Sequence, residues 1–187
     1  MSQARTVFKA LVLSLAAMVL VVLGVGQLLA TRWQVETVRV LRADPARVAA
    51  LVRDLGSWQK WSAIEVNLGA QTARQVTGDA GSGAQRIEWS GQLGQAVLTA
   101  TAVTESSLDY RIGFLMATPP SPGQGRVEWQ AVADGTRVRW LDEGSFDSII
   151  LRWFGWFGAL QERVKQIQSS SLEALEQELE RANTPPK

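Results

Sequence analysis

The feature that most constrains this chain is an uncharged run near its N-terminus. Residues 10–31 hold no Asp, Glu, Lys or Arg over 22 positions, and a helix needs about 20 apolar residues to cross a bilayer. A secretory signal peptide is the alternative, but its apolar core is typically about 7 to 15 residues long and precedes a small-x-small cleavage site. The last candidate site, residues 28–30, has a bulky Leu at its first position. We therefore expect residues 1–31 to be a short tail and an uncleaved, single-pass membrane anchor.

The charges beside this anchor do not decide its orientation. Arg5 and Lys9 precede the run, while Arg32, Arg39 and Arg42 follow it, so the two sides nearly tie. A short basic tail before a single anchor usually stays in the cytoplasm. On that ground we expect the remainder of the chain to lie on the extracytoplasmic side, in the periplasm of a bacterium with two membranes.

The composition excludes several classes of function. The chain has no Cys and no His, so disulfides, thiolate or imidazole metal sites and His-dependent catalytic mechanisms are excluded. We expect neither a metal nor a cofactor. Basic and acidic residues are nearly balanced after residue 31, and no run of Lys or Arg forms a stripe. Nucleic acid is therefore not an expected partner.

Apolar and polar residues alternate through most of the chain after the anchor, which predicts a series of strands. A helix interrupts the series where Asp44 and Pro45 supply an N-cap and a first-turn proline. Asp134-Gly135 predicts a hairpin turn. From residue 149 to 182 the apolar residues recur at helical spacing, which predicts one long amphipathic helix. The predicted strands are 33–41, 65–76, 84–91, 95–104, 108–116, 126–132 and 136–143.

Aromatic residues share one face of these strands. Trp89, Trp129 and Trp140 alternate with charged residues, and Tyr110 belongs to the apolar set of a fourth strand. An antiparallel sheet with one apolar face must cover that face. The long C-terminal helix is the expected cover.

Four segments carry a family resemblance: residues 44–48 (DPARV), 51–61 (LVRDLGSWQKW), 135–140 (GTRVRW) and 171–176 (SLEALE). Over about residues 35–182, the chain resembles the polyketide cyclase/dehydrase and lipid-transport group of the START/Bet v 1-like (SRPBCC) superfamily. The resemblance implies an α+β helix-grip fold over residues 32–183, in which a curved antiparallel sheet grips the C-terminal helix, followed by a short tail at 184–187. It also implies a deep apolar cavity for lipids, sterols, polyketides or quinones.

Three functions are compatible with this resemblance. We favour binding or transfer of a hydrophobic small molecule by a membrane-anchored domain. The first alternative is a cyclase- or dehydrase-like enzyme that acts on an apolar substrate in the same cavity, with Asp142 or Tyr110 as acid–base candidates. The second is a ligand-sensing or chaperone-like accessory domain that acts through a protein partner. The absence of His, and of any ionisable cluster assignable to the cavity, disfavours an enzyme.

Two sets of residues are candidates for the site. Aromatic and aliphatic side chains of the inner face are expected either to line the cavity or to pack as core. A second aromatic set is expected at the cavity rim or in contact with the membrane, or else packed at the start of the last helix. The cavity set is Trp89, Tyr110, Ile112, Phe114, Met116, Trp129, Trp140, Leu160 and Val164. The rim set is Trp58, Trp61, Trp153, Phe154, Trp156 and Phe157.

Overall fold

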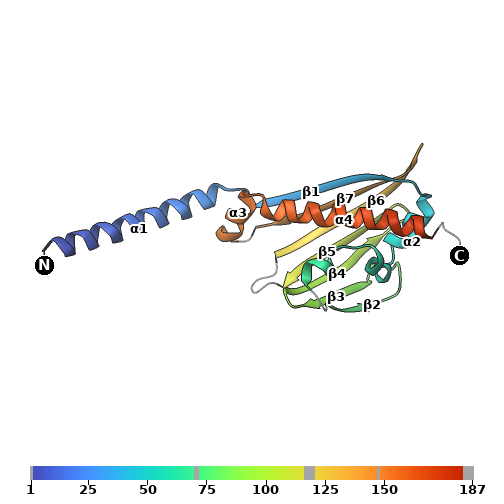
Figure 1. Ribbon diagram of the computed structural model, residues 1–187, viewed down its shortest axis with the longest axis horizontal. Helices are drawn as coiled ribbons and strands as arrows, with labels where there is room; N and C mark the ends of the chain where they lie inside the picture. The colour runs from blue at the N-terminus through green and yellow to red at the C-terminus, as the bar shows by residue number, and fades with distance from the viewer. Residues whose placement is uncertain (1, 70–71, 116–120, 147, 183–187) are drawn as a thin grey trace.

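An antiparallel sheet and a long C-terminal helix form the body of the protein in a computed structural model (Figure 1). The structure describes residues 2–69, 72–115, 121–146 and 148–182. The seven described strands are hydrogen-bonded in the order β1-β7-β6-β5-β4-β3-β2. In chain order the elements are α1 (Ser2–Leu28), β1 (Arg32–Leu41), α2 (Pro45–Val52), η1 (Leu55–Lys60), η2 (Glu65–Leu68), β2 (Ala73–Thr77), β3 (Arg86–Gly91), β4 (Gly94–Val103), β5 (Ser107–Leu115), β6 (Ser121–Val132), β7 (Gly135–Ser145), α3 (Ile149–Trp156) and α4 (Ala159–Arg181).

Helix α1 projects from the end of the sheet where β1 begins (Figure 1). Its segment Val7–Leu28 is long and apolar enough to cross a membrane, and no other helix among the described residues is. Gly26 is buried, whereas the rest of the segment is almost entirely exposed. By length and composition, α1 could serve as a membrane anchor or as a signal sequence.

The inner face of the sheet is apolar, as the alternating pattern predicts. Burial alternates along β7, where Val138 and Trp140 are buried and Arg137 is exposed. The C-terminal half of α4 covers this face with the buried side chains Leu172, Leu175 and Leu179. Two polar contacts fasten the helix along β1 and to α2: Arg39 Nη2 lies 2.8 Å from Glu176 Oε2, and Arg47 Nη2 donates to the Leu179 carbonyl at 2.7 Å.

The predicted start of the first helix of the domain is confirmed. Asp44 is the N-cap of α2, and its side chain accepts a hydrogen bond from the Ala46 N–H at 2.8 Å. Asp54 caps η1 in the same way through the Gly56 N–H, at 2.9 Å. These caps satisfy backbone donors that a helix start leaves unpaired.

The prediction of one helix from residue 149 to 182 is wrong. Gly158 adopts φ +73°, a left-handed conformation that interrupts the helix and separates α3 from α4. The long predicted strand at 65–76 is also wrong, because residues Glu65–Leu68 form the 3-10 helix η2 and only Ala73–Thr77 form β2. Strand β6 begins at Ser121, five residues before the predicted start at 126.

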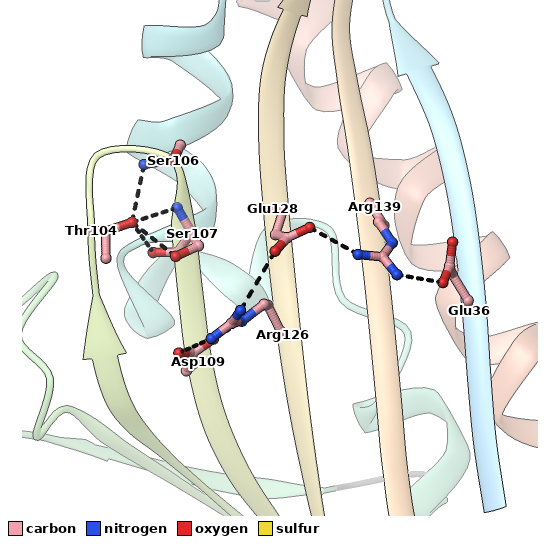
Figure 2. A network of polar contacts seen from close by, with 8 residues as sticks. All are labelled: Glu36, Thr104, Ser106, Ser107, Asp109, Arg126, Glu128 and Arg139. Atoms are coloured by element: carbon pink, nitrogen blue, oxygen red, sulfur yellow. Dashed lines mark hydrogen bonds and ion pairs between the residues drawn. The ribbon is translucent and has the colours of Figure 1, made fainter.

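Charged residues alternate in sign across the outer face of the sheet, from β1 to β5 (Figure 2). Arg139 on β7 pairs with Glu36 on β1 at 2.8 Å and with Glu128 on β6 at 3.2 Å. Arg126 continues the row, donating to Asp109 on β5 at 2.7 Å. All five side chains are partly exposed, so each pair stabilises the fold by at most about 1 kcal/mol.

Candidate functional site

The interior between the sheet and α4 holds a cluster of four aromatic rings. Trp58 on η1 lies 4.8 Å from Trp61, 5.8 Å from Tyr110 and 5.6 Å from Trp140, as measured between ring centroids. Three of the four ring pairs meet edge to face, an arrangement that is favourable between aromatic quadrupoles. The loop after α2 is therefore joined to the inner face of β5 and β7 through aromatic contacts.

Each buried Trp has its indole N–H satisfied. A buried Trp needs a partner for this single donor, and here every partner is a protein atom. The acceptors are the Val52 carbonyl for Trp58 (2.9 Å), the Leu51 carbonyl for Trp61 (3.3 Å), Glu65 Oε1 for Trp89 (2.9 Å), the Glu105 carbonyl for Trp129 (3.0 Å) and the Tyr110 hydroxyl for Trp140 (2.6 Å).

A buried chain of polar groups runs from this cluster to α4. The Trp140 N–H donates to the Tyr110 hydroxyl, which donates to Asp142 Oδ1. Gln168 on α4 donates from Nε2 to Asp142 Oδ2 at 2.8 Å, and its Oε1 accepts from the Thr37 hydroxyl at 2.6 Å. The chain thus joins β1, β5, β7 and α4 with both oxygens of the carboxyl engaged.

Burial sets the titration of this network. It raises the pKa of Asp142 from 3.8 to about 6, although the hydrogen bonds from Tyr110, Gln168 and Trp140 oppose the rise. The pKa of Tyr110 also lies well above its usual value, first because of burial and then because of the neighbouring Asp142 charge. The phenol therefore stays protonated at neutral pH, whereas the pKa of the carboxyl lies just below neutral pH.

Gly125 on β6 lets Tyr110 and Asp142 meet. It lies between them in the sheet, paired with Tyr110 on β5 and with Asp142 on β7. A Cβ at this position would overlap both the phenol ring and the carboxylate. The residue must therefore be glycine for the two side chains to lie side by side over β6.

The N-terminal half of α4 is packed less completely than the C-terminal half. Leu160 and Val164 are half-buried, whereas Leu172 and Leu175 are fully buried. Gln161 lies seven residues before Gln168 and therefore on nearly the same face of the helix. Its Oε1 is buried and, among the described residues, is the one buried side-chain oxygen or nitrogen with no hydrogen-bond partner.

The sheet opposite this part of α4 carries two glycines. Gln168 contacts Thr37. The seven residues from Gln161 to Gln168 span about 10 Å of helix, which equals about three residues of a strand at about 3.3 Å each. Gln161 therefore lies at the level of a residue roughly three before Thr37. The inner-face row at that level runs Trp33, Gly144, Gly123, Ile112 across β1, β7, β6 and β5. Strands β7 and β6 therefore contribute no side chain of their own at this level, where the Trp33 ring lies over Gly144 and the Ile112 side chain lies beside Gly123.

The predicted cavity residues lie on the inner face where the structure describes their side chains. Tyr110, Ile112 and Trp140 lie on or next to the glycine-bearing rows, whereas Trp89 and Trp129 are buried with their N–H groups bonded elsewhere in the core. Met116 and the side chains of Phe114 and Phe154 lie outside the described residues.

The rim set divides into two groups. Trp58 and Trp61, expected at the rim, are instead buried in the core, because their N–H groups bond the carbonyls at the end of α2 and their rings pack on Trp140. In the second group, Trp156 and Phe157 are exposed and Trp153 is partly exposed, at the junction of α3 with α1.

Sequence reasoning missed the polar members of the site. Gln161 and Gln168 interrupt the apolar stripe of α4 in phase with Val164 and Leu172, and a polar residue in phase with a buried stripe is a signal of a buried hydrogen bond. The pattern could therefore have identified them. Thr37 and Gly125 have no such signal, because their roles depend on which strands become neighbours.

Two surface hollows lie on the opposite, outer face of the sheet. They share the lining residues Arg111, Gln124 and Glu143, which alternate with the inward-facing Tyr110, Gly125 and Asp142. Their polar lining is unlike the apolar surface that a hydrophobic ligand needs.

Comparison with known proteins places this architecture in a family. A family model described as polyketide cyclase / dehydrase and lipid transport matches residues 32–180. The chain belongs to this family. The match spans the sheet and nearly all of α4 and begins after α1. A comparison with curated proteins returned no match.

Solved structures share the same fold. A protein of Chromobacterium violaceum is 20% identical, with a TM-score of 0.54 over 79% of this chain and 96% of its own. A protein of Mesorhizobium loti is 16% identical, with a TM-score of 0.58 over 80% and 98%. The protein Ara h 8.0201 is 12% identical, with a TM-score of 0.55 over 79% and 97%. The predicted START/Bet v 1-like helix-grip fold is thereby confirmed, and the family supports binding of a hydrophobic ligand as the general function.

Proposed function

We propose that this protein is a membrane-anchored binder or carrier of a hydrophobic small molecule. The family description supports the ligand class, and the apolar segment of α1 supports the anchor. The observation that carries the proposal is a contrast within the grip, by which we mean the sheet together with α4. The C-terminal half of α4 places the fully buried Leu172 and Leu175 in the core, while its N-terminal half carries the half-buried Leu160 and Val164 and a buried, unpartnered amide oxygen on Gln161.

The ligand would lie between the N-terminal half of α4 and the glycine-bearing row of the sheet. Leu160, Val164 and Ile112 supply apolar contacts there, and Tyr110 and Trp140 form the inner limit of the space. Pockets for small molecules are mostly apolar with few polar groups. The Gln161 amide oxygen is placed to accept a hydrogen bond from a ligand hydroxyl or amide, which would fix the orientation of an otherwise apolar molecule.

Native mass spectrometry of the full chain, released from detergent micelles, tests this proposal. The expected result is a co-purified apolar molecule that adds a discrete mass to the protein. Val164→Trp should reduce the bound fraction by roughly tenfold, since a bulky ring at this position fills the proposed space. Lys165→Trp is the matched control, because it adds the same ring to the neighbouring, exposed position.

The outcomes are distinct. Loss of the added mass in Val164→Trp alone supports the site. Equal occupancy in both variants contradicts it. A protein that carries no apolar molecule and binds none of a panel of fatty acids, sterols and quinones also contradicts it. A thermal melt of each variant separates ligand loss from unfolding.

One observation favours the enzyme alternative. Asp142 is a buried carboxyl with a pKa of about 6, next to Tyr110 on the proposed ligand space, and groups with such pKa values serve as general acids or bases. Both of its oxygens are already engaged by protein donors. A binder with Asp142→Asn should retain its ligand, whereas an enzyme with this change should accumulate unconverted substrate in the same mass spectrum.

A further inference from the structure

Helix α3 contacts α1 as well as the rest of the domain. The Trp153 indole N–H donates to the Val22 carbonyl at 3.3 Å, and Arg152 Nη1 donates to Gln27 Oε1 at 3.3 Å. Figure 1 shows α3 beside the end of α1. Gly26 makes this approach possible, since a Cβ there would overlap Ile149 and lie 2.9 Å from Trp153 Nε1. Small residues allow such close helix contacts in membranes.

The contact places α3 at a definite depth if α1 spans a bilayer. Val22 lies six residues before Leu28, the last residue of the candidate span. At 1.5 Å per residue this is about 9 Å inside the end of the span. Amphipathic helices that lie in the plane of a membrane bury their apolar face about 5–10 Å into the boundary between headgroups and acyl chains. The two depths agree.

The composition of α3 fits this layer. Its sequence, IILRWFGW, contains one basic and no acidic residue. Ile150, Trp156 and the following Phe157 are exposed at 68%, 63% and 71%, respectively, and the rings of Trp153, Trp156 and Phe157 contact one another. Trp is enriched at membrane interfaces because its apolar ring can contact lipid while its N–H forms a hydrogen bond with a polar group.

We infer that α3 is a second membrane-contacting element, embedded in the interfacial layer of the bilayer that α1 spans and held at that depth by its contact with Gly26. The inference rests on the anchor in the proposed function. Because Gly158 leads directly from α3 into the first turn of α4, the Leu160–Val164 end of the grip lies at the bilayer surface. A hydrophobic molecule then passes between the lipid and the proposed site without crossing bulk water.

Single-cysteine labelling of the full chain in liposomes tests the inference, because the native chain has no Cys. Phe157→Cys and Ile150→Cys report on α3. Asp134→Cys, in the β6–β7 turn, is the control because Asp134 is exposed and lies beside the end of β1, at the opposite end of the sheet from α1. A membrane-impermeant maleimide should label both α3 positions at least roughly tenfold more slowly than Asp134→Cys, since lipid shields them. Labelling after solubilisation in SDS normalises each rate.

A second pair of variants tests the α1 contact. Gly26→Leu should separate α3 from α1 and bring the labelling rate at Phe157→Cys close to that of the control. Gly24→Leu makes the same change where no atom outside the helix lies within 4 Å, so protection should persist. Equal labelling in the two leucine variants would overturn the contact as the determinant of depth.

The remaining outcomes separate this inference from its premise. If alkaline carbonate extracts the protein from the liposomes, α1 does not span the bilayer, and the inference fails together with the anchor. A protein that resists carbonate but labels as fast at residue 157 as at residue 134 keeps its anchor and overturns the inference alone. Neither outcome affects the mass-spectrometric test of ligand binding.

Discussion

The hydroxyl of Tyr110 joins two polar groups that the core would otherwise leave unpaired. Replacing Tyr110 with Phe removes the acceptor of the Trp140 N–H and a donor to Asp142. An unsatisfied buried polar group costs about 1–3 kcal/mol, so we expect the free energy of unfolding to fall by about that amount. Urea denaturation of the full chain in detergent micelles, followed by Trp fluorescence, measures the change. Gln124→Ala, which removes an exposed hydrogen bond to Glu143, should be nearly neutral, and an equally small effect of Tyr110→Phe would contradict the prediction.

Asp142 makes the stability of the protein depend on pH. Its pKa is raised from 3.8 to about 6 in the folded state, so between these values the folded protein holds a proton that the unfolded chain releases. The free energy of unfolding therefore falls as the pH rises through this window. Two pKa units correspond to about 3 kcal/mol as an upper bound. Urea midpoints measured from pH 4 to pH 7 should show the fall.

Asp142→Asn should remove most of this pH dependence. The amide is neutral throughout the window and can still accept from Tyr110. If the Gln168 amide turns over, its oxygen accepts from the new Asn N–H and its nitrogen donates to the Thr37 hydroxyl, so the network stays paired. Asp109→Asn on the outer face is the control and should keep the dependence. An unchanged slope in Asp142→Asn would assign the titration to another group.

At the scale of elements, the break between α3 and α4 depends on the backbone of Gly158. Its φ of +73° is unfavourable for an L-residue by about 1–2 kcal/mol, and no atom lies within 4 Å of a Cβ built there. Gly158→Ala should therefore destabilise the protein by about that backbone cost alone. Gly113→Ala on β5 also meets no atom within 4 Å but has no positive φ, so it should be neutral. Thermal melts of the two variants provide the comparison, and equal melting temperatures would contradict the argument.

These element-scale features show what sequence reasoning could and could not predict. Strand alternation and the Asp44-Pro45 start were readable because they depend on residues a few positions apart. The interruption at Gly158 was not, since a single Gly inside a helical pattern is compatible with a continuous helix. The early start of β6 was also hidden, because its first residues include Pro122, Gly123 and Gly125, which are typical of loops. Only the packing of Tyr110 over the neighbouring strand explains why Gly125 lies within a sheet.

The same limit applies to Trp58 and Trp61. Their spacing indicated a loop, and an aromatic loop near a cavity is a reasonable rim. Their burial is decided by a contact between residues far apart in the sequence, the edge-to-face contact of both rings with Trp140. Gln161 and Gln168 were visible in the helical pattern, but the partner of Gln168 was not, since it required knowing that β1 and β7 are neighbours.

At the scale of the whole molecule, the grip has two unlike ends. The end that holds Leu172, Leu175 and the aromatic cluster is tightly packed and distant from α1. The other end holds the half-buried Leu160 and Val164, the unpartnered Gln161 Oε1 and the contact between α3 and α1. Ligand-binding regions are commonly drawn from the less stable part of a fold. The chain therefore separates the part that maintains the fold from the part proposed to bind and exchange a ligand next to the membrane.

This asymmetry predicts a gradient of hydrogen exchange along α4. Amides in residues 171–179 should exchange only through near-global unfolding, because Leu172, Leu175 and Leu179 bury this segment in the core, whereas residues 160–164 should exchange through local opening at least roughly a hundredfold faster. Mass-spectrometric exchange of the full chain in lipid nanodiscs measures both segments at once. Addition of a fatty acid that binds should slow exchange in residues 160–164 and leave residues 171–179 unchanged, since ligand stabilises only the states that hold it. Uniform exchange along α4, or equal slowing of both segments, would show that the helix opens as one unit and would contradict the division of the grip into two ends.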